Sequence, residues 1–279
     1  MVGRTLASRV IAAEALDGMT ESDPAAQRSR RDLRRIHRAM GTRAIVRRAL
    51  REMIESTDGA PLTARRPLRV LELGAGDGTL MLRVARSLAA RWPAVELTLL
   101  DRQALVEPST IDGYAACGWT ATPCVMDVLE WASIAMPLAA AARSDATVQW
   151  DVIVANLFLH HFEAPQLDAL LAAIAARSTR FFACEPRRAT LALIGSRLVG
   201  ALGANAVTRA DAVLSVHAGF RGSELSALWP RHAKGWHLRE YPAGLFSHCL
   251  HAERSHAGEG ATAPAAPLGR ARPTAGMPQ

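Results

Sequence analysis

The chain has 279 residues, 49% of them hydrophobic, and a formal net charge of +7 at pH 7. Such a chain can bury one sizeable core, so we expect one catalytic domain with extensions. No run of roughly 18 apolar residues could span a membrane, and the N-terminus lacks the apolar core of a secretory signal, so we expect a cytoplasmic protein.

The first 57 residues have a helical pattern from residue 3 onward. Leu33, Ile36 and Met40 make one apolar stripe, and arginines occupy the other faces. Gly41 and Thr42 are expected to end one helix and cap the next. The arginine run lacks interleaved aromatic residues, so we favour a solvated helix face, and nucleic acid is a disfavoured partner. We assign residues 1–66 to an N-terminal helical extension or lid.

From residue 67 onward, short apolar segments alternate with longer helical ones, which indicates a parallel α/β sheet. A short Pro-Ala-Gly connection at residues 242–244 favours a terminal antiparallel hairpin. We predict a doubly wound, mostly parallel seven-stranded sheet over residues 67–253, with N-terminal accessory helices and a disordered tail over residues 254–279. The expected strands are Leu68–Leu73, Val95–Leu100, Thr122–Met126, Val148–Ala155, Arg180–Cys184, Trp236–Tyr241 and Leu245–His251.

The four cysteines show no CxxC spacing and fall in apolar or strand-like segments. We therefore expect reduced, partly buried thiols, and neither a disulfide framework nor a metal site.

A glycine loop, Gly74-Ala75-Gly76-Asp77-Gly78, follows the first strand and precedes a helix. Glycine lets the backbone turn sharply and touch a ligand, and the helix N-terminus offers free N–H donors. The spacing departs from the dinucleotide pattern G-x-G-x-x-G, since Thr79 stands where the last glycine would be, which weakens a nicotinamide interpretation. Asp101, Asp127 and Asn156 end the next three strands, at the edge where α/β sheets bind ligands.

The order of Glu72, the glycine loop, Asp101, Asp127 and Asn156 resembles the class I S-adenosylmethionine-dependent methyltransferase superfamily, in its small-molecule branch. The resemblance implies S-adenosylmethionine as cofactor. It implies a methionine contact for Glu72 and the loop, a ribose contact for Asp101, an adenine contact for Asp127 and Val128, and an amino-end contact near Asn156. The full set of cofactor-binding residues we expect is Glu72, Gly74, Ala75, Gly76, Gly78, Asp101, Arg102, Asp127, Val128, Asn156 and Leu157.

His160 and His161 follow Asn156 and lie near the expected point of methyl transfer. Either could act as a base on a hydroxyl acceptor, or the pair could simply cap or pack a helix. The loop does not read Asn-Pro-Pro-Tyr, which disfavours exocyclic base amines as acceptors. Together, the segments 184–188 and 211–221 resemble those of bacterial methyltransferases that act on aromatic or polyketide metabolites.

The leading hypothesis is therefore O-methylation of an aromatic or polyketide-type small molecule. Methylation on carbon needs the same cofactor site with a differently placed base. An RNA methyltransferase that grips with its arginine-rich helices and a non-catalytic S-adenosylmethionine-binding regulatory protein are the alternatives that stay open.

Overall fold

Seven strands build one sheet, and their order shows where its ligand-binding edge lies. The computed structural model describes residues 6–55, 66–92, 94–134 and 149–255. β1 (Leu68–Leu73) pairs in parallel with β2 (Val95–Asp101) and β4 (Val152–Asn156), in the strand order β3-β2-β1-β4-β5-β7-β6. The other strands are β3 (Trp119–Val125), β5 (Arg180–Pro186), β6 (Trp236–Ala243) and β7 (Ser247–Arg254). The order reverses between β1 and β4, the switch point where open α/β sheets bind ligands.

The predicted sheet and its terminal hairpin are confirmed, while several strand ends differ. β7 pairs antiparallel with both β5 and β6, and the other described neighbours are parallel. β3 begins at Trp119 rather than Thr122, because it pairs with β2 along its whole length from Val95 onward. β4 begins at Val152 rather than Val148, and residue 148 lies outside the described residues.

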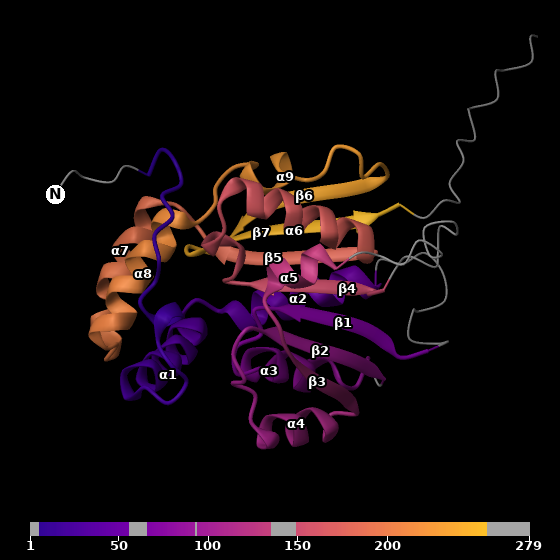
Figure 1. The fold of residues 1–279 in the computed structure, drawn as a ribbon, viewed down its shortest axis with the longest axis horizontal. Helices are drawn as coiled ribbons and strands as arrows, with labels where there is room; N and C mark the ends of the chain where they lie inside the picture. Colours follow the sequence, from indigo (N-terminus) through magenta and orange to yellow (C-terminus); the bar gives the residue numbers. More distant parts are fainter. Residues whose placement is uncertain (1–5, 56–65, 93, 135–148, 256–279) are drawn as a thin grey trace, which may run out of the picture.

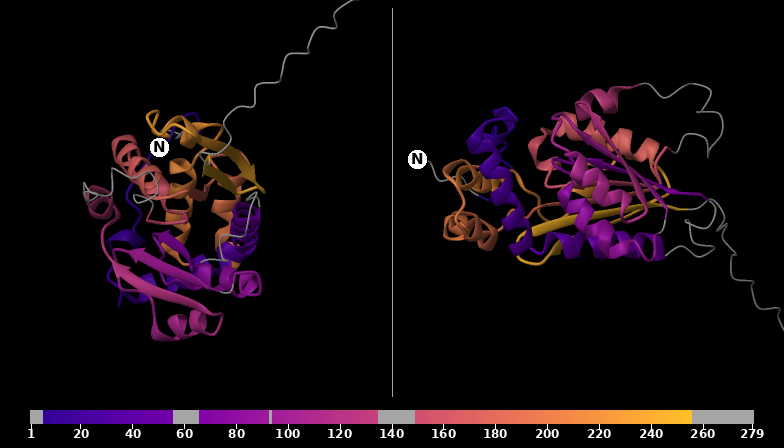
Figure 2. Two further views of the ribbon diagram at one scale, coloured as in Figure 1. Left: turned by 90° about the vertical axis from the view of Figure 1, so that its right-hand side faces the viewer. Right: turned by 90° about the horizontal axis from the view of Figure 1, so that it is seen from below.

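Helices cover both faces of the sheet (Figures 1 and 2). One core lies between the sheet and α2, α3 and α4, and the other lies between the sheet and α5, α6 and α9. The helices are α1 (Pro24–Ala39), α2 (Thr42–Glu55), α3 (Thr79–Leu88), α4 (Pro108–Ala115), α5 (Val128–Ser133), α6 (Ala164–Arg177), α7 (Thr190–Leu198), α8 (Ala206–Ala218) and α9 (Glu224–Ala227), with 3-10 turns η1 (Leu16–Gly18), η4 (Leu159–His161) and η5 (Val199–Leu202).

The N-terminal segment corrects one prediction. Described residues 6–23 are irregular except for η1, although a helix was expected from residue 3. Tertiary hydrogen bonds replace helical ones here: Val10 N donates to His217 O (3.1 Å), and the Asp211 carboxylate accepts from Ala15 N (2.9 Å) and Leu16 N (3.0 Å). The segment is thereby attached along α8.

The first true helix begins later, and its start follows local rules. The Asp23 carboxylate accepts hydrogen bonds from Ala25 N and Ala26 N, and Pro24 occupies the first helical turn. Gly41, with φ +71°, ends α1 as predicted. The capping role expected of Thr42 is wrong, since Thr42 is the first residue of α2 and its buried hydroxyl has no hydrogen-bond partner among the described residues.

The helix α2 belongs to the sheet's own core rather than to a lid. Its Val46, Leu50 and Met53 are fully buried and pack in the same cluster as β1, β2 and α3. A domain boundary at residue 66 therefore divides residues that share one hydrophobic core.

A helical cap lies beyond the carboxyl ends of the parallel strands. It consists of α1, which precedes the sheet in the chain, and of α7 and α8, which are inserted between β5 and β6 (Figure 1). The cap is held together by buried polar contacts: Asp32 Oδ2 accepts from Asn205 N (2.8 Å), and Ser29 Oγ bonds to the Asn205 amide. Of the segment predicted to be a lid, α1 lies in this cap beside α7 and α8.

Two composition-based predictions can be compared with the described residues. All four cysteines lie within them and are free thiols; Cys184 and Cys249 are buried, and Cys117 and Cys124 are half-buried. None of the described helices combines the length and the apolar character that crossing a membrane requires. The tail predicted to be disordered lies, from residue 256 onward, outside the described residues.

Candidate functional site

A cavity of about 820 Å³ lies between the carboxyl edge of the sheet and the helical cap. Its volume is within the range of small-molecule sites. Nearly all of the predicted site residues line it, on four strand ends and the loops that follow them: Glu72, Gly74, Ala75, Gly76, Asp101, Arg102, Asp127, Val128, Asn156, Leu157, His160 and His161. The exception is Gly78, the last residue of the glycine loop, which does not line the cavity. Its carbonyl accepts a hydrogen bond from the Tyr114 hydroxyl (2.7 Å).

The glycine loop has the backbone that its sequence predicts. Gly74, Gly76 and Gly78 all have φ between +56° and +69°, the region that glycine enters without strain. A Cβ on Gly74 would lie 2.2 Å from the Phe158 ring, so this position also requires glycine for space. Asp101 Oδ2 accepts a hydrogen bond from Gly76 N (2.8 Å), which connects the loop to the end of β2.

Two buried oxygen acceptors in the cavity wall have no hydrogen-bond partner among the described residues. They are Glu72 Oε2 and Asn156 Oδ1, at the ends of the adjacent strands β1 and β4. Burial, together with the charges of Asp77 and Asp101, raises the pKa of Glu72 to about 8. A buried polar atom without a partner is costly, so these acceptors suit a ligand that brings its own donors.

Asp127 and Arg102 already have partners within the protein. The Asp127 carboxylate caps α5 by accepting from Leu129 N (2.7 Å), and Val128 is buried beside it. The Arg102 guanidinium donates to the Asp17 carbonyl and lies 3.6 Å from its carboxylate. Arg102 therefore connects the N-terminal segment to the cavity, and the sequence had no signal for that contact.

The loop after β4 is held in an unusual backbone conformation. Leu157 has φ +51°, a region that side chains other than those of Gly, Asn and Asp rarely enter. Leu157 N donates to Cys184 O (2.8 Å) on the neighbouring strand. Such strain persists only where the surroundings over-determine it, and it is typical of functional sites.

Glu185 holds this loop in place through hydrogen bonds to its backbone. The sequence analysis assigned Glu185 no role. Its fully buried carboxylate, near the end of β5, accepts hydrogen bonds from the backbone N–H groups of Phe158 (3.1 Å), Leu159 (3.0 Å) and His160 (3.3 Å). The same carboxylate contacts His160 Nδ1 at 2.8 Å. The sequence signal for this role was an acidic residue near the end of a strand. That signal does not identify its partners, which lie in the loop after the neighbouring strand β4.

The two predicted histidines each have a carboxylate partner. His160 is 2% exposed and lies between Glu185 and Glu14, whose Oε1 is 3.5 Å from Nε2. Burial lowers the pKa of His160, but the two carboxylates outweigh burial and raise it to about 9. The His161 ring lies against His160, with centroids 4.2 Å apart, and its Nδ1 is 3.2 Å from Asp17 Oδ2. Glu14 and Asp17 come from the irregular N-terminal segment, where the sequence analysis expected a helix.

The cap side of the cavity is largely apolar. The predicted stripe of Leu33, Ile36 and Met40 lines it, together with Val216 of α8 and Phe246 before β7. The apolar stripe of α1 therefore faces the cavity.

His37 on α1 also lines the cavity, although the sequence analysis did not consider it. Burial lowers its pKa to about 4, with the charge of Asp77 acting in the opposite direction. The imidazole is therefore neutral at pH 7.

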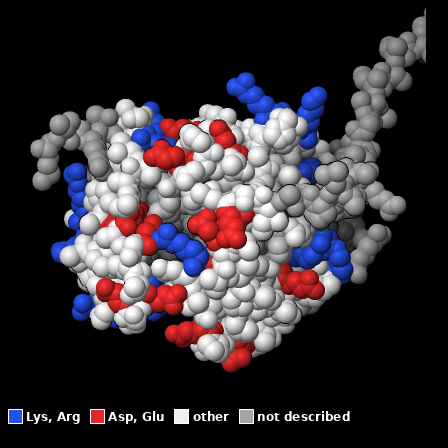
Figure 3. All heavy atoms as spheres, viewed as in Figure 1, with Lys and Arg blue, Asp and Glu red and all other residues white. Residues whose placement is uncertain are grey.

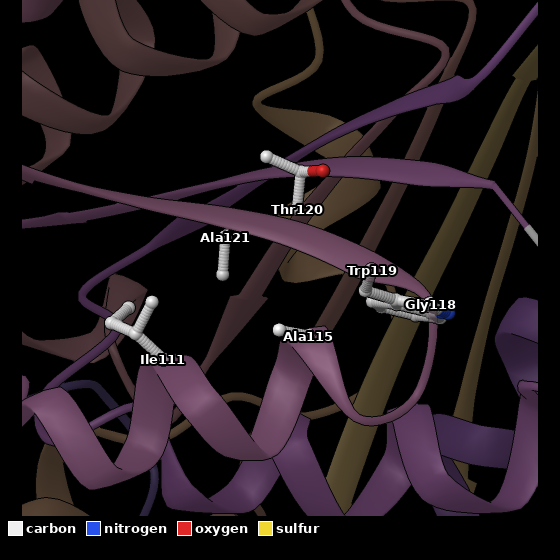
Figure 4. A pocket seen from close by; sticks show the side chains of 6 residues that line it. All are labelled: Ile111, Ala115, Gly118, Trp119, Thr120 and Ala121. Carbon is white, nitrogen blue, oxygen red and sulfur yellow. The ribbon is translucent and has the colours of Figure 1, made fainter.

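A second, shallower hollow of about 340 Å³ lies between α4 and β3 (Figure 4). Ile111 and Ala115 of α4 face Ala121 across it, whereas Thr120 points to the other side of the strand. Its lining holds no charged side chain. The larger cavity is therefore the candidate site.

Several arginines of the arginine-rich helices form intramolecular ion pairs near the protein surface. Arg34 pairs with Asp77 of the glycine loop (2.6 Å), Arg35 with Asp32 (3.2 Å) and Arg48 with Glu52 (2.7 Å). On the face shown in Figure 3, positive and negative side chains are interspersed.

Comparison with known proteins identifies the fold. No family model matches the chain, and no curated protein matches it in sequence. Among solved structures it is similar to the plantazolicin methyltransferase BpumL in complex with SAH, with 14% identity, a TM-score of 0.56 and coverage of 84% of this chain and 91% of that one. A putative O-methyltransferase from Nostoc punctiforme PCC 73102 has 14% identity and a TM-score of 0.51, with coverage of 88% and 64%. The chain has the fold of class I methyltransferases.

Proposed function

We propose that this chain, which has the class I methyltransferase fold, is an S-adenosylmethionine-dependent methyltransferase with a small-molecule acceptor. One observation carries the proposal: the glycine loop and the partnerless acceptors of Glu72 and Asn156 converge on one cavity at the switch point of the sheet. The solved BpumL structure, which shares the fold, contains SAH.

The residues in the cavity wall fit the parts of the cofactor. Glu72 Oε2 and Asn156 Oδ1 can accept from the cofactor's ammonium group, because neither has another donor among the described residues. Asp101 accepts one backbone N–H on each oxygen, from Gly76 and from Gln103 (3.0 Å), and each oxygen keeps capacity for a ribose hydroxyl. Asp127 and Val128 are assigned to the adenine. The bound cofactor supplies the methyl group.

The apolar cap wall supports an aromatic or polyketide-type acceptor, because such molecules bury large apolar surfaces. We assign the acceptor's reacting hydroxyl to the vicinity of His160 and His161. His160 is held between Glu14 and Glu185, so His161, whose Nδ1 lies beside Asp17, is the member of the pair that takes the hydroxyl's proton. In-line transfer then needs alignment and the exclusion of water, which the cap supplies. Methyl transfer from labelled cofactor to components of a metabolite extract tests this assignment, and tight cofactor binding without any transfer would favour a regulatory protein.

The cofactor is tested directly by binding. We expect S-adenosylmethionine and S-adenosylhomocysteine to raise the melting temperature of the purified protein, since a ligand that binds only the folded state stabilises it. NAD is the control and should leave the melting temperature unchanged. A shift with NAD alone would reject the proposal.

Replacing Asp101 should weaken cofactor binding strongly. Asp101→Ala removes the expected ribose acceptor and the hydrogen bond to Gly76 N. Hydrogen bonds to charged groups contribute about 1.5–3 kcal/mol, so we expect a roughly 10- to 100-fold higher Kd for S-adenosylhomocysteine by calorimetry. Asp112→Ala, an exposed aspartate on α4, is the matched control and should bind normally. An unchanged Kd in Asp101→Ala would remove the assignment.

A further inference from the structure

Glu14, His160 and His161 bring three metal-ligand groups together in the cavity wall. One ligand atom from each lies within 4.8 Å of the other two. We propose that these residues bind a divalent transition-metal ion, with zinc as the expected metal. The sequence analysis expected no metal site, because the cysteines show no CxxC spacing. It did not connect Glu14 with the two histidines, which lie far from it in the chain.

Both histidine rings have a carboxylate beside Nδ1, as metal-binding histidines commonly do. His160 Nδ1 lies 2.8 Å from Glu185 Oε2, and His161 Nδ1 lies 3.2 Å from Asp17 Oδ2. A histidine that binds metal almost always donates its other N–H to a carboxylate or carbonyl, which sets the tautomer and the ring direction. Nε2 is therefore the nitrogen that each ring would offer to an ion, and metal binding would displace the proton by which His160 pairs with Glu14.

The position of His160 Nε2 supports the same conclusion. This atom is buried, has no hydrogen-bond partner among the described residues, and is 3.5 Å from Glu14 Oε1. Two ligands held at zinc distances of about 2.0–2.2 Å in a tetrahedron are about 3.4 Å apart. The pair therefore already has the spacing of two ligands of one ion, and Ser215 Oγ orients Glu14 by donating to its Oε1.

The surrounding charges favour a cation. Glu14, Asp17 and Glu185 place three carboxylates beside the histidines. A fourth carboxylate, that of Asp211, accepts a hydrogen bond from the backbone N–H of Ala15, the residue after Glu14. Two cationic side chains offset them in part: Arg9 donates to the His160 carbonyl (3.3 Å), and Arg102 contacts Asp17.

The ligand set indicates the metal class. Two imidazoles and one carboxylate suit zinc and neighbouring transition metals, whereas magnesium and calcium prefer oxygen ligands alone. Three protein ligands leave one position open, and all three residues line the cavity.

If the proposed function holds, the acceptor's hydroxyl oxygen takes the open position. The cation lowers the pKa of that hydroxyl, and its proton leaves to solvent. The oxygen then forms a bond to the methyl carbon while the carbon–sulfur bond breaks, and the electron pair stays on sulfur. The histidine pair would then act as ligands of the ion rather than as a free base.

Metal binding is tested on the full chain after chelation and dialysis. We expect Zn²⁺ to bind with one-to-one stoichiometry by calorimetry and Co²⁺ to give the visible absorption of a site with nitrogen and oxygen ligands, while Mg²⁺ gives neither signal. His160→Ala and Glu14→Gln should each weaken Zn²⁺ binding at least tenfold. His237→Ala, an exposed histidine on β6, is the matched control and should bind as wild type.

A further variant separates a metal site from a structural role. Asp17→Asn changes the partner of His161 without removing a ligand, and loss of such a partner typically weakens metal binding 10- to 100-fold. Each variant's affinity for S-adenosylhomocysteine checks that it is folded. Wild-type protein that binds S-adenosylhomocysteine but not Zn²⁺, or equal Zn²⁺ affinity in wild type and His160→Ala, would overturn the inference. Zn²⁺ binding without S-adenosylhomocysteine binding would instead overturn the proposed function.

Discussion

Glu185→Ala should destabilise the fold by about 3–5 kcal/mol, the usual cost of removing one member of a buried charged pair. The Glu185 carboxylate is fully buried and accepts three backbone N–H groups of residues 158–160 as well as contacting His160 Nδ1. Alanine would leave all of these donors without a partner, in a place that water cannot readily reach. Urea unfolding of the protein without ligands measures the loss.

The isosteric variant Glu185→Gln distinguishes hydrogen bonding from simple packing. Its amide oxygen can accept from one of the two pairs of donors, but its NH2 group faces the other pair and the negative charge is lost, so we expect a stability between those of wild type and Glu185→Ala. Glu130→Ala, an exposed glutamate on α5, should change the free energy of unfolding by less than about 0.5 kcal/mol. Equal stability of Glu185→Ala and wild type would show that the loop is held by other contacts.

Gly74→Ala should both destabilise the protein and abolish cofactor binding. Alanine at φ +66° costs about 1–2 kcal/mol, and its Cβ would lie 2.2 Å from the Phe158 ring. Relief of that overlap requires movement of the glycine loop or of Phe158, at a further cost of about 1–3 kcal/mol. Urea unfolding and calorimetry with S-adenosylhomocysteine measure the two effects.

Gly76→Ala is the matched control, because Gly76 has φ +56° and a Cβ there would meet nothing within 4 Å. It should therefore show the backbone cost alone and be more stable than Gly74→Ala. Adding Phe158→Ala to Gly74→Ala should restore part of the lost stability relative to the sum of the single changes. Equal losses for Gly74→Ala and Gly76→Ala would contradict the steric explanation.

The parallel sheet was predictable because its strands have local signals. β1 and β5 are apolar runs buried on both faces, which is the pattern of a central parallel strand, and β1 has the bounds predicted for it. The strand ends were less predictable where pairing sets them. β3 extends back to Trp119 because β2 offers partners that far, and a hydropathy pattern contains no information about a neighbour.

The N-terminal region shows why helix prediction was only partly right. The helical signal was the apolar stripe of Leu33, Ile36 and Met40, which lies at α1, whereas residues 6–23 bond instead to α8 and to the Asp211 carboxylate. Tertiary contacts override propensities that amount to fractions of a kcal/mol per residue. The assignment of α2 to a lid failed for a related reason, because an amphipathic pattern predicts a buried face and not the surface that buries it.

The part of the cavity that is built by strand ends could be predicted from the sequence. Glycines after β1 and polar residues after β2, β3 and β4 meet at one edge because parallel strands direct their carboxyl ends to the same side. The rest of the cavity wall depends on contacts between segments that are distant in the chain. Glu14, Asp17 and Glu185 reach the histidines from separate segments, and the hydrogen bonds and buried charges that hold them there exist only in the folded chain.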